Sequence, residues 1–526
     1  MTDEPKERLS IAPQDDMQFD VVIVGAGAAG CVLANRLSED PGRAVALVEA
    51  GPDYGPDPAA WPAETRDPSD IWPDSHPWGY LHAGRPADRP LPLPRARVVG
   101  GSSTINGCIW VRGSALDFDA WAALGNPGWS FAELLPYFRR AEADPMGGPL
   151  HGGDGPVPIT RIATADLDPV DRAFVATAEA LGFPWIADLN GAPVQRPGVG
   201  PTPKNLADGA RMHAAFTYLA PARQRPDLAI FPDTLVDRVC LDRGRATGVR
   251  TADGREIHGR HVVLCAGAYG SPAILLRSGI GPAADLRSLG IPVVADRPGV
   301  GAHLLDHPTV NFANEDHFAT YRIIPAFAPA AASAVSTLLK ARSNQEDEDT
   351  DLFIIHGQYF DKAHDSWVAW FLLNLEVAPS QGHVRLTAPD PAATLDIDHN
   401  YLAHPTELEA CCDGMEFIRR LVNTQPLAGT IDPIPGAVPA WQDRDDLRAR
   451  VRDSVSTTYH PSSTCRMAPA TDPGAVVDHA GRVHGIDGLR VADASVFPTS
   501  PRANLHCTVV AVAEKLADAI RNDFTG

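Results

Sequence analysis

The sequence has no apolar run of the roughly 18 to 20 residues that a membrane-spanning helix requires. Residues 1–18 are polar and acidic and contain no apolar signal core, so nothing in them predicts export. We expect these residues to form a flexible tail. The sequence therefore predicts a cytoplasmic protein without a membrane span.

Positive charge is scarce. Lys and Arg number 45 against 66 Asp and Glu, and the net charge of −21 disfavours nucleic acid or an anionic membrane as a partner. The eight cysteines are scattered without a CxxC pair or zinc spacing, which predicts reduced, buried thiols and no metal site. The 526 residues, 44% of them apolar, suffice for two or three domain cores.

A strand, a glycine turn, a helix and a second strand are predicted over residues 20–51. Val21 to Val24 form a β-branched run typical of a strand buried on both faces of a parallel sheet. Gly25 permits a tight turn, Gly27 lets the backbone approach a pyrophosphate, and Gly30 lets the next helix pack on the strand. The N–H groups and dipole of that helix would hold the pyrophosphate.

Glu49 ends the second strand, which begins near Ala44, and a carboxylate at that position is expected to bind an adenosine ribose. All parts of a dinucleotide-binding unit thus occur in order. The motif alone does not separate FAD from NAD, and a glycine turn that holds no nucleotide remains the alternative.

Prolines, aspartates and tryptophans crowd residues 52–94, which predicts extended backbone, without long helices, over the nucleotide site. The following Gly100-Gly-Ser-Ser103 run supplies N–H and hydroxyl donors suited to a phosphate or to the edge of a polar ring. A simple glycine-rich loop is the alternative, and these residues alone do not decide between the two.

Helices are predicted over Asp119–Glu142, Asp168–Leu181, Met212–Arg223 and from Pro272 to Arg277. Strands are predicted over Leu228–Phe231, Val236–Leu241, Ala246–Val249 and His261–Gly267, so the chain returns to the first sheet. Residues 303–455 then leave it again. In that segment, Leu352–Ile355 and Trp367–Leu375 predict an antiparallel sheet, and Glu346–Asp351 predicts a solvated loop.

The last 70 residues combine polar chemistry with a helix. Tyr459-His460-Pro461 sets a histidine before a proline bend, and Gly488–Pro498 predicts a strand and a turn. Thr499–Cys507 is an expected loop, and a helix over Thr508–Arg521 would point its N-terminus at Asn504 and His506. Judged alone, His460 is more simply a loop histidine that caps backbone groups.

Together these motifs resemble the glucose–methanol–choline (GMC) oxidoreductases, a family of FAD enzymes that mostly oxidise alcohols. The likeness runs nearly end to end, in the family's order and spacing. It covers Gly25–Gly30 with Glu49, Ala96–Asn106 through Asp119, Gly267–Gly281, Pro298–Pro308, His460-Pro461, Asp493 and Glu514-Lys515.

The resemblance implies an α/β fold in which a Rossmann-like FAD-binding domain is interleaved with a substrate-binding domain built on an antiparallel sheet flanked by helices. We assign residues 19–150, 226–302 and 456–526 to the FAD-binding domain. Residues 151–225 and 303–455 are assigned to the substrate-binding domain.

Residue by residue, the family's first active-site histidine falls on His460 and its second position on Asn504. His506 falls where relatives face the flavin, and Ile105 stands where a histidine can attach FAD covalently, which implies non-covalent FAD. Ser463 and His303 depart from the common glycine and asparagine. The residues expected to bind FAD are Gly25, Gly27, Ala28, Gly30, Glu49, Ala50, Arg97, Gly100, Gly101, Ser102, Asn106, Val236, Asp493, Ala494 and His506.

Alcohol oxidation by a flavin requires a base for the hydroxyl proton while a hydride leaves carbon. A neutral His460 could serve as this base and Asn504 could donate to the alkoxide. Either oxygen or another acceptor could take the electrons, a lyase or decarboxylase is the alternative reaction, and a non-catalytic flavoprotein fits less well. Five aromatic residues predict an apolar or aromatic primary alcohol, although each could instead belong to a core: Trp72, Trp78, Trp367, Trp370 and Phe371.

Overall fold

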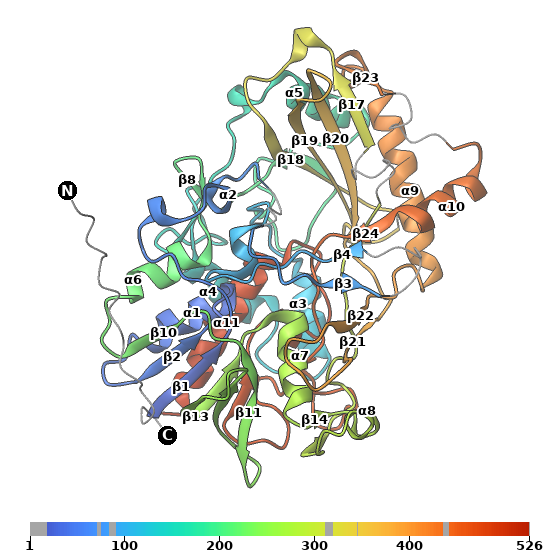
Figure 1. The fold of residues 1–526 in the computed structure, drawn as a ribbon. Coiled ribbons are helices and arrows are strands. Elements are labelled where there is room, and N and C mark those ends of the chain that lie inside the picture. Colours follow the sequence, from blue (N-terminus) through green and yellow to red (C-terminus); the bar gives the residue numbers. More distant parts are fainter. Residues whose placement is uncertain are drawn as a thin grey trace, which may run out of the picture.

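A computed structural model describes residues 18–70, 75–83, 91–310, 319–344, 346–434 and 441–524 of the chain. Two large sheets with packed helices dominate it, one below and one above in Figure 1. The expected tail lies outside the described residues except for Gln18, which begins the first strand. The chain passes between the two sheets several times, so neither is built from one continuous segment.

The lower sheet has the predicted Rossmann-like arrangement. Its parallel strands lie in the order β10 (Leu228–Phe231), β2 (Val45–Val48), β1 (Gln18–Val24), β13 (Glu256–Leu264) and β25 (Leu489–Val491). A hairpin of β11 (Val236–Asp242) and β12 (Arg245–Thr251) pairs antiparallel with the first half of β13. Helix α1 (Ala28–Leu37) follows the glycine turn and packs against α11 (Leu505–Asn522).

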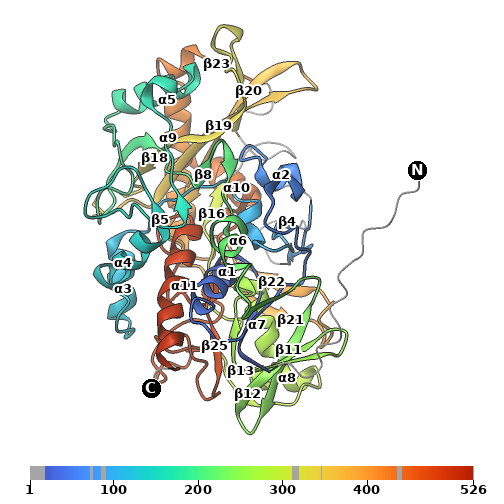
Figure 2. The same cartoon turned by 90° about the vertical axis from the view of Figure 1, so that its left-hand side faces the viewer.

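The upper sheet is antiparallel and flanked by helices, as predicted. Its strands lie in the order β23 (Ile431–Pro433), β17 (Ala319–Ile323), β20 (Ser366–Leu375), β19 (Leu352–Asp361), β18 (Ser333–Ala341) and β7 (Gly198–Pro201). Beside β20, β16 (Pro308–Val310) also pairs with β24 (Val455–Thr457). Figure 2 shows this sheet from the side, with α5 (Pro169–Ala180) and α9 (Pro405–Val422) packed near it.

Successive side chains of β20 point to opposite faces of this sheet. Phe371 and Leu373 pack into the core shared with α5 and α9. Trp370 and Leu372 face the other way, toward a smaller apolar cluster and a large cavity. One face of the sheet therefore belongs to the hydrophobic core, and the other forms a wall of the cavity.

The predicted helix over Asp119–Glu142 is in fact two helices, α3 (Ala115–Ala123) and α4 (Phe131–Ala141). Gly125, with a φ of +92°, and Pro127 lie between them, and such residues end a helix. The predicted helix over Met212–Arg223 is a π-helical turn followed by α6 (Ala220–Ala222), because Pro221 has no N–H to continue a regular helix.

Helix α7 (Gly267–Arg277) begins five residues before the predicted Pro272. Proline inside a helix leaves the carbonyl four residues earlier without its N–H partner. Here the Thr464 hydroxyl donates to the Ala268 carbonyl at 2.6 Å, so a distant segment supplies the missing bond. Similarly, α11 begins at Leu505 and not at Thr508, which places His506 in its first turn.

The acidic run Glu346–Asp351 is only half solvated. Asp349, Thr350 and Asp351 are buried, and the Ser343 N–H donates to Asp351 Oδ1 at 2.8 Å. The prediction of a solvated loop is therefore wrong for the second half of the run. The cause is that this half leads directly into the buried strand β19, so its polar groups must find partners within the protein.

Residues 52–94 contain no long helix where they are described, as predicted. The remaining α-helices and strands, all short except α10, are α2 (Ala63–Arg66), β3 (Leu81–His82), β4 (Leu91–Pro92), β5 (Glu142–Ala143), β6 (Val157–Pro158), β8 (Leu206–Ala207), β9 (Ala210–Arg211), β14 (Ile280–Gly281), α8 (Ala283–Ser288), β15 (Ala295–Asp296), β21 (His383–Leu386), β22 (Leu395–Asp398) and α10 (Arg444–Ser454).

All eight cysteines are free thiols, and seven of them are buried. Cys240 is the partly exposed one. No helix in the described ranges is both long enough and apolar enough to cross a membrane.

Candidate active site

A cavity of about 2060 Å³ lies between the two sheets and takes residues from both. Ordinary ligand pockets measure about 300 to 1,000 Å³, so this one has room for a dinucleotide and a second molecule. Of the residues assigned from the sequence, fifteen line it: Gly25, Gly27, Ala28, Glu49, Ala50, Arg97, Gly101, Ser102, Asn106, Val236, His460, Asp493, Ala494, Asn504 and His506. The tertiary structure thus brings together positions from the whole length of the chain.

The glycine turn gives three glycines three different environments. Gly25 has a φ of +97°, and a Cβ there would lie 2.5 Å from the Cys265 carbonyl oxygen. A Cβ on Gly30 would lie 1.9 Å from the Gly25 oxygen, so Gly30 permits close packing and does not line the cavity. A Cβ on Gly27 would meet no atom within 4 Å and would enter the cavity, in space that a pyrophosphate could occupy.

Glu49 closes this end of the cavity. Its two carboxylate oxygens accept the Ala26 N–H at 2.8 Å and the Gly51 N–H at 2.9 Å. Burial raises the pKa of Glu49 to about 7, against the lowering effect of these bonds and of Arg97. The carboxylate therefore orders the turn and also faces the cavity.

The second glycine loop packs directly on the first. The Gly100 N–H donates to the Ala26 carbonyl at 2.7 Å, and a Cβ on Gly101 would lie 2.7 Å from the Gly27 Cα atom. The Ser103 hydroxyl, expected as a donor to a ligand, instead donates to the Gly100 carbonyl at 2.6 Å. Gly100 thus shapes the floor of the cavity without lining it.

Asp493, between β25 and α7, is committed to protein contacts. One carboxylate oxygen accepts the Gly267 N–H at 2.8 Å and the Ser271 hydroxyl at 2.6 Å, and the other accepts two bonds from Ser495. Its side chain holds the first turn of α7 at the cavity wall.

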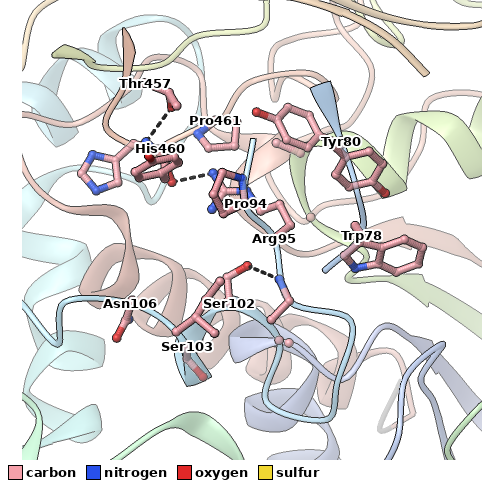
Figure 3. A pocket seen from close by; sticks show the side chains of 18 of the residues that line it. Trp78, Tyr80, Pro94, Arg95, Ser102, Ser103, Asn106, Thr457, His460 and Pro461 are labelled. Carbon is pink, nitrogen blue, oxygen red and sulfur yellow. Dashed lines mark hydrogen bonds between the residues drawn. The ribbon is translucent and has the colours of Figure 1, made fainter. Parts of the chain in front are cut away.

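His460 and Asn504 meet at the far end of the cavity. His460 follows β24 and precedes Pro461, and Asn504 is the residue before the first turn of α11. The Asn504 Nδ2 lies 3.2 Å from His460 Nε2, and the His460 backbone N–H donates to Asp306 Oδ1 at 2.8 Å. In Figure 3, His460 and Pro461 lie across the cavity from Ser102.

The imidazole of His460 is neutral. Burial holds its pKa well below the ordinary 6.5, and His307 and Arg95 lower it further. His460 is only 9% exposed, which fits the neutral form that the sequence analysis expected. A neutral imidazole can accept a proton, which is what a base for a hydroxyl group must do.

His506 lies beside this pair but has a different environment. Its ring packs edge-on against Trp110, with centroids 5.3 Å apart, and burial lowers its pKa to about 4.

Three residues near the pair were missed by the sequence analysis. His307 and Glu376 lie behind His460, and Arg95 donates from Nη2 to the Tyr459 carbonyl at 2.6 Å. His307 belongs to a segment that carried the family resemblance and Arg95 directly precedes another, but only the fold shows that they approach His460. Glu376 follows an apolar strand and had no such signal.

The five predicted aromatic wall residues separate into groups. Trp78 and Trp370 line the cavity, and Trp78 stacks on Tyr80 with centroids 5.7 Å apart (Figure 3). Trp367 and Phe371 pack into the core on the helix side of the upper sheet. For these two the prediction of a cavity wall is wrong, because β20 alternates its faces. Trp72 lies outside the described residues.

The two departures from the family pattern both fit their positions. Ser463 has a φ of +72°, in the left-handed region that favours glycine, and its N–H donates to the Ala494 carbonyl. His303 has a φ of +56°, and its Nδ1 lies 2.7 Å from Gln381 Oε1. Asparagine also tolerates this conformation, which accounts for its frequency there.

Comparisons with known proteins agree along the whole chain. Models of the GMC oxidoreductase N- and C-terminal parts match residues 19–309 and 378–513. The chain is 35% identical to an oxygen-dependent choline dehydrogenase of Rhizobium etli, covering 96% of each chain, and 37% identical to a 5-(hydroxymethyl)furfural oxidase of Methylovorus sp., covering 96% of this chain and 99% of that one. The structure of pyridoxine 4-oxidase from Mesorbium loti superimposes with a TM-score of 0.84 at 31% identity, covering 97% and 99% of the two chains.

Proposed function

Because this chain belongs to the GMC oxidoreductase family and is an FAD-dependent enzyme acting on CH–OH groups, we propose that it oxidises a primary alcohol to an aldehyde with His460 as the base. The observation that carries this proposal is the pairing of a neutral His460 with Asn504 at 3.2 Å, at one end of a cavity whose other end is the glycine turn.

FAD fits the residues present. The open space over Gly27 suits its pyrophosphate, and the Glu49 carboxylate suits its adenosine ribose. The Arg97 Nε donates to the Ala50 carbonyl at 3.0 Å, which ties the second loop to this end of the cavity. When bound, FAD supplies the acceptor of a hydride from the alcohol carbon.

We propose that FAD is bound without a covalent link. Ile105 lines the cavity where a covalent attachment site is expected, and its hydrocarbon side chain has no nucleophilic atom. Acid precipitation of the purified protein should therefore release the yellow cofactor into the supernatant. Flavin that stays with the precipitate would contradict this assignment.

The residues at the other end of the cavity would handle the proton. His460 Nε2 faces Asn504 and accepts the hydroxyl proton of the alcohol, while the Asn504 amide donates a hydrogen bond to the oxygen that becomes negative. The N-terminus of α11, beginning at Leu505, adds its dipole to the same wall and favours negative charge there.

We propose a neutral, apolar or aromatic primary alcohol as the substrate. Trp370, Ile355 and Leu372 form the apolar part of the wall that the upper sheet contributes, and this part suits such a side chain better than a sugar. The relatives named above act on choline, 5-(hydroxymethyl)furfural and pyridoxine, each of which carries a primary hydroxyl group. The electrons pass on to oxygen or to another acceptor.

Anaerobic mixing tests the substrate class. We expect benzyl alcohol and 5-(hydroxymethyl)furfural to bleach the flavin faster than choline or glucose at equal concentration. Admitting oxygen afterwards distinguishes an oxidase, in which the colour returns at once, from a dehydrogenase, in which it returns only with a dye or quinone. Equal bleaching by glucose and benzyl alcohol would remove the basis for an apolar substrate.

A further inference from the structure

The buried side chains of His307 and Glu376 lie one behind the other on the far side of His460 from the cavity. Strand pairing explains why they lie side by side. In the antiparallel pair of β16 and β20, Thr309 lies opposite Asn374, so the same register continued two residues places His307 opposite Glu376. On its other side β16 pairs with β24, which leads directly to His460. His307 Nδ1 lies 2.9 Å from His460 Nδ1 and 3.1 Å from Glu376 Oε2.

The contacts of His307 determine where its proton sits. Its Nε2 lies 3.0 Å from the Ser500 hydroxyl, and the neighbouring Pro501 carbonyl also receives a hydrogen bond from His307. A carbonyl oxygen only accepts, and Nδ1 is already engaged with His460, so the proton is on Nε2. His307 Nδ1 therefore offers a lone pair.

Only one hydrogen fits between two nitrogen atoms 2.9 Å apart. Because His307 Nδ1 is the acceptor, the hydrogen is on His460 Nδ1. A neutral imidazole carries one N–H, so His460 Nε2 has a free lone pair. That lone pair faces the Asn504 amide at 3.2 Å and the cavity.

Glu376 completes the arrangement. Both its side chain and that of His307 are fully buried, and among the described residues its carboxyl oxygens have no hydrogen-bond donor apart from the contact with His307. An ionised carboxylate without donors is costly to bury, so the neutral carboxylic acid is favoured. Its O–H then points at His307 Nδ1 and shares that lone pair with His460.

We propose that His307 and Glu376 are positioning residues that hold His460 in its Nδ1–H tautomer and so keep Nε2 unprotonated toward the substrate, an inference that rests on the proposed role of His460 as the base. Neither residue touches the substrate. Their effect is to select which nitrogen of His460 is basic.

The arrangement has a consequence at alkaline pH. Burial raises the pKa of Glu376 to about 8; Lys340 lowers it, and Asp117 and Asp306 raise it further. When Glu376 loses its proton to solvent, its carboxylate requires a hydrogen-bond donor. His307 becomes this donor when its proton moves from Nε2 to Nδ1. His460 Nδ1 then becomes an acceptor, its own proton moves to Nε2, and the base is lost.

The rate of flavin reduction between about pH 6 and about pH 10 tests this sequence of events. The wild-type rate should fall above about pH 8. Glu376→Gln keeps a donor toward His307 at every pH, so it should stay within roughly twofold of the wild-type rate at neutral pH and lose the alkaline fall.

His307 is tested by two variants. His307→Asn retains an acceptor near the Nδ1 position and should keep most activity, whereas His307→Leu should lower the rate roughly 10- to 100-fold, with FAD content unchanged. His356→Leu is the matched control for the loss of a buried histidine, since His356 binds Thr337 and Asp171 away from the pair. It should lower the melting temperature but leave the pH profile unchanged.

A readout independent of activity is the nitrogen chemical shift of His460 in protein labelled with ¹⁵N-histidine, assigned by its absence in His460→Gln. We expect a protonated Nδ1 and a bare Nε2 at neutral pH, reversed at alkaline pH and unaffected by pH in Glu376→Gln. A protonated Nε2 at neutral pH would overturn the inference. So would a Glu376→Gln variant as slow at neutral pH as His307→Leu.

Two further results separate the possible failures. If His460→Ala reduces flavin at the wild-type rate, the proposed function itself fails. If His460→Ala is slow but His307→Leu leaves the tautomer unchanged, only the positioning role fails. The three side chains also place ligand-type atoms within 4.8 Å of one another, so a stoichiometric metal ion in the purified enzyme would overturn the inference by occupying the lone pairs.

Discussion

The proton affinity of each active-site histidine is set by its surroundings and not by its residue type. Burial lowers the pKa of His307 and of His506 to about 4, and it holds the pKa of His460 well below 6.5. All three rings are therefore neutral near pH 7. The distinction between them lies in their contacts, and His460 alone has both an amide donor at Nε2 and a histidine at Nδ1.

The first prediction separates these residues by substitution. His460→Ala should lower the rate of flavin reduction by roughly 10² to 10⁴, the usual contribution of a positioned base. Asn504→Ala removes a neutral donor and should cost less. In the wild type the rate should fall on acidification only below the ordinary histidine pKa, because the imidazolium form of His460 is disfavoured until then.

Anaerobic stopped-flow measurements of His460→Ala, Asn504→Ala and His506→Ala across pH check this prediction. His506→Ala should keep the acidic fall, since its ring packs on Trp110 and does not contact Asn504 through a described hydrogen bond. An acidic fall that survives in His460→Ala and disappears in His506→Ala would transfer the role of base to His506.

At the scale of an element, Gly27 and Gly30 serve different purposes in the strand, turn and helix of residues 18–37. Gly27 has an ordinary negative φ of −70° and open space at its Cβ position. Gly30 has the Gly25 carbonyl 1.9 Å from its Cβ position. Gly27 thus leaves room for a ligand, and Gly30 leaves room for the backbone of Gly25.

Alanine substitution should therefore have opposite consequences at the two positions. Gly27→Ala should leave the melting temperature of the apoprotein unchanged but weaken FAD binding, because the methyl group enters the cavity. Gly30→Ala should lower the melting temperature, because a backbone atom must move. Thermal unfolding and FAD titration of both apoproteins measure this. A Gly27→Ala variant that binds FAD normally would place the pyrophosphate elsewhere.

At the scale of the whole molecule, a buried ion network ties the end of α4 to the loops that follow it. His151 Nε2 lies 2.8 Å from Asp188 Oδ2, and its Nδ1 lies within 3.2 Å of Glu142 and Asp144. Arg161 bonds both Asp144 and Asp188. Hydrogen bonds that His151 donates to Asp144, Asp188 and Glu142 raise its pKa to about 10.

This network predicts how stability depends on pH. His151 binds its proton more tightly in the folded chain, so its contribution is complete below pH 6.5 and is lost as the pH rises toward 10. Burial alone would raise the pKa of Asp144, but bonds from His151 and Arg161 lower it, so the contribution of Asp144 is lost on acidification. The network is strongest between about pH 4 and about pH 6.5.

Thermal unfolding of the wild type should therefore show a falling melting temperature from about pH 6.5 to about pH 10. His151→Gln keeps hydrogen bonding but has no titrating charge, so its melting temperature should fall less over the same range. Parallel curves for the two proteins would show that His151 does not contribute in this way.

The sequence by itself determined what depends on neighbours along the chain. Four features were sufficient to predict both sheets and the family: the β-branched run before Gly25, the spacing of the three glycines, the apolar runs Leu352–Ile355 and Trp367–Leu375, and the order of the family motifs. Helix boundaries were predicted less accurately where a residue distant in the sequence hydrogen-bonds to the end of the helix. The Thr464 hydroxyl at the Ala268 carbonyl allows α7 to begin before Pro272.

Only the tertiary structure decided which face of β20 meets the cavity and what lies behind His460. Periodicity shows that Trp370 and Phe371 point in opposite directions, but not which partner each face receives. His307 and His460 are 153 residues apart, and their contact follows from strand pairings that local sequence does not encode. The proton affinity of each histidine depends on burial and on such contacts, so it is determined by the tertiary packing and not by the local sequence.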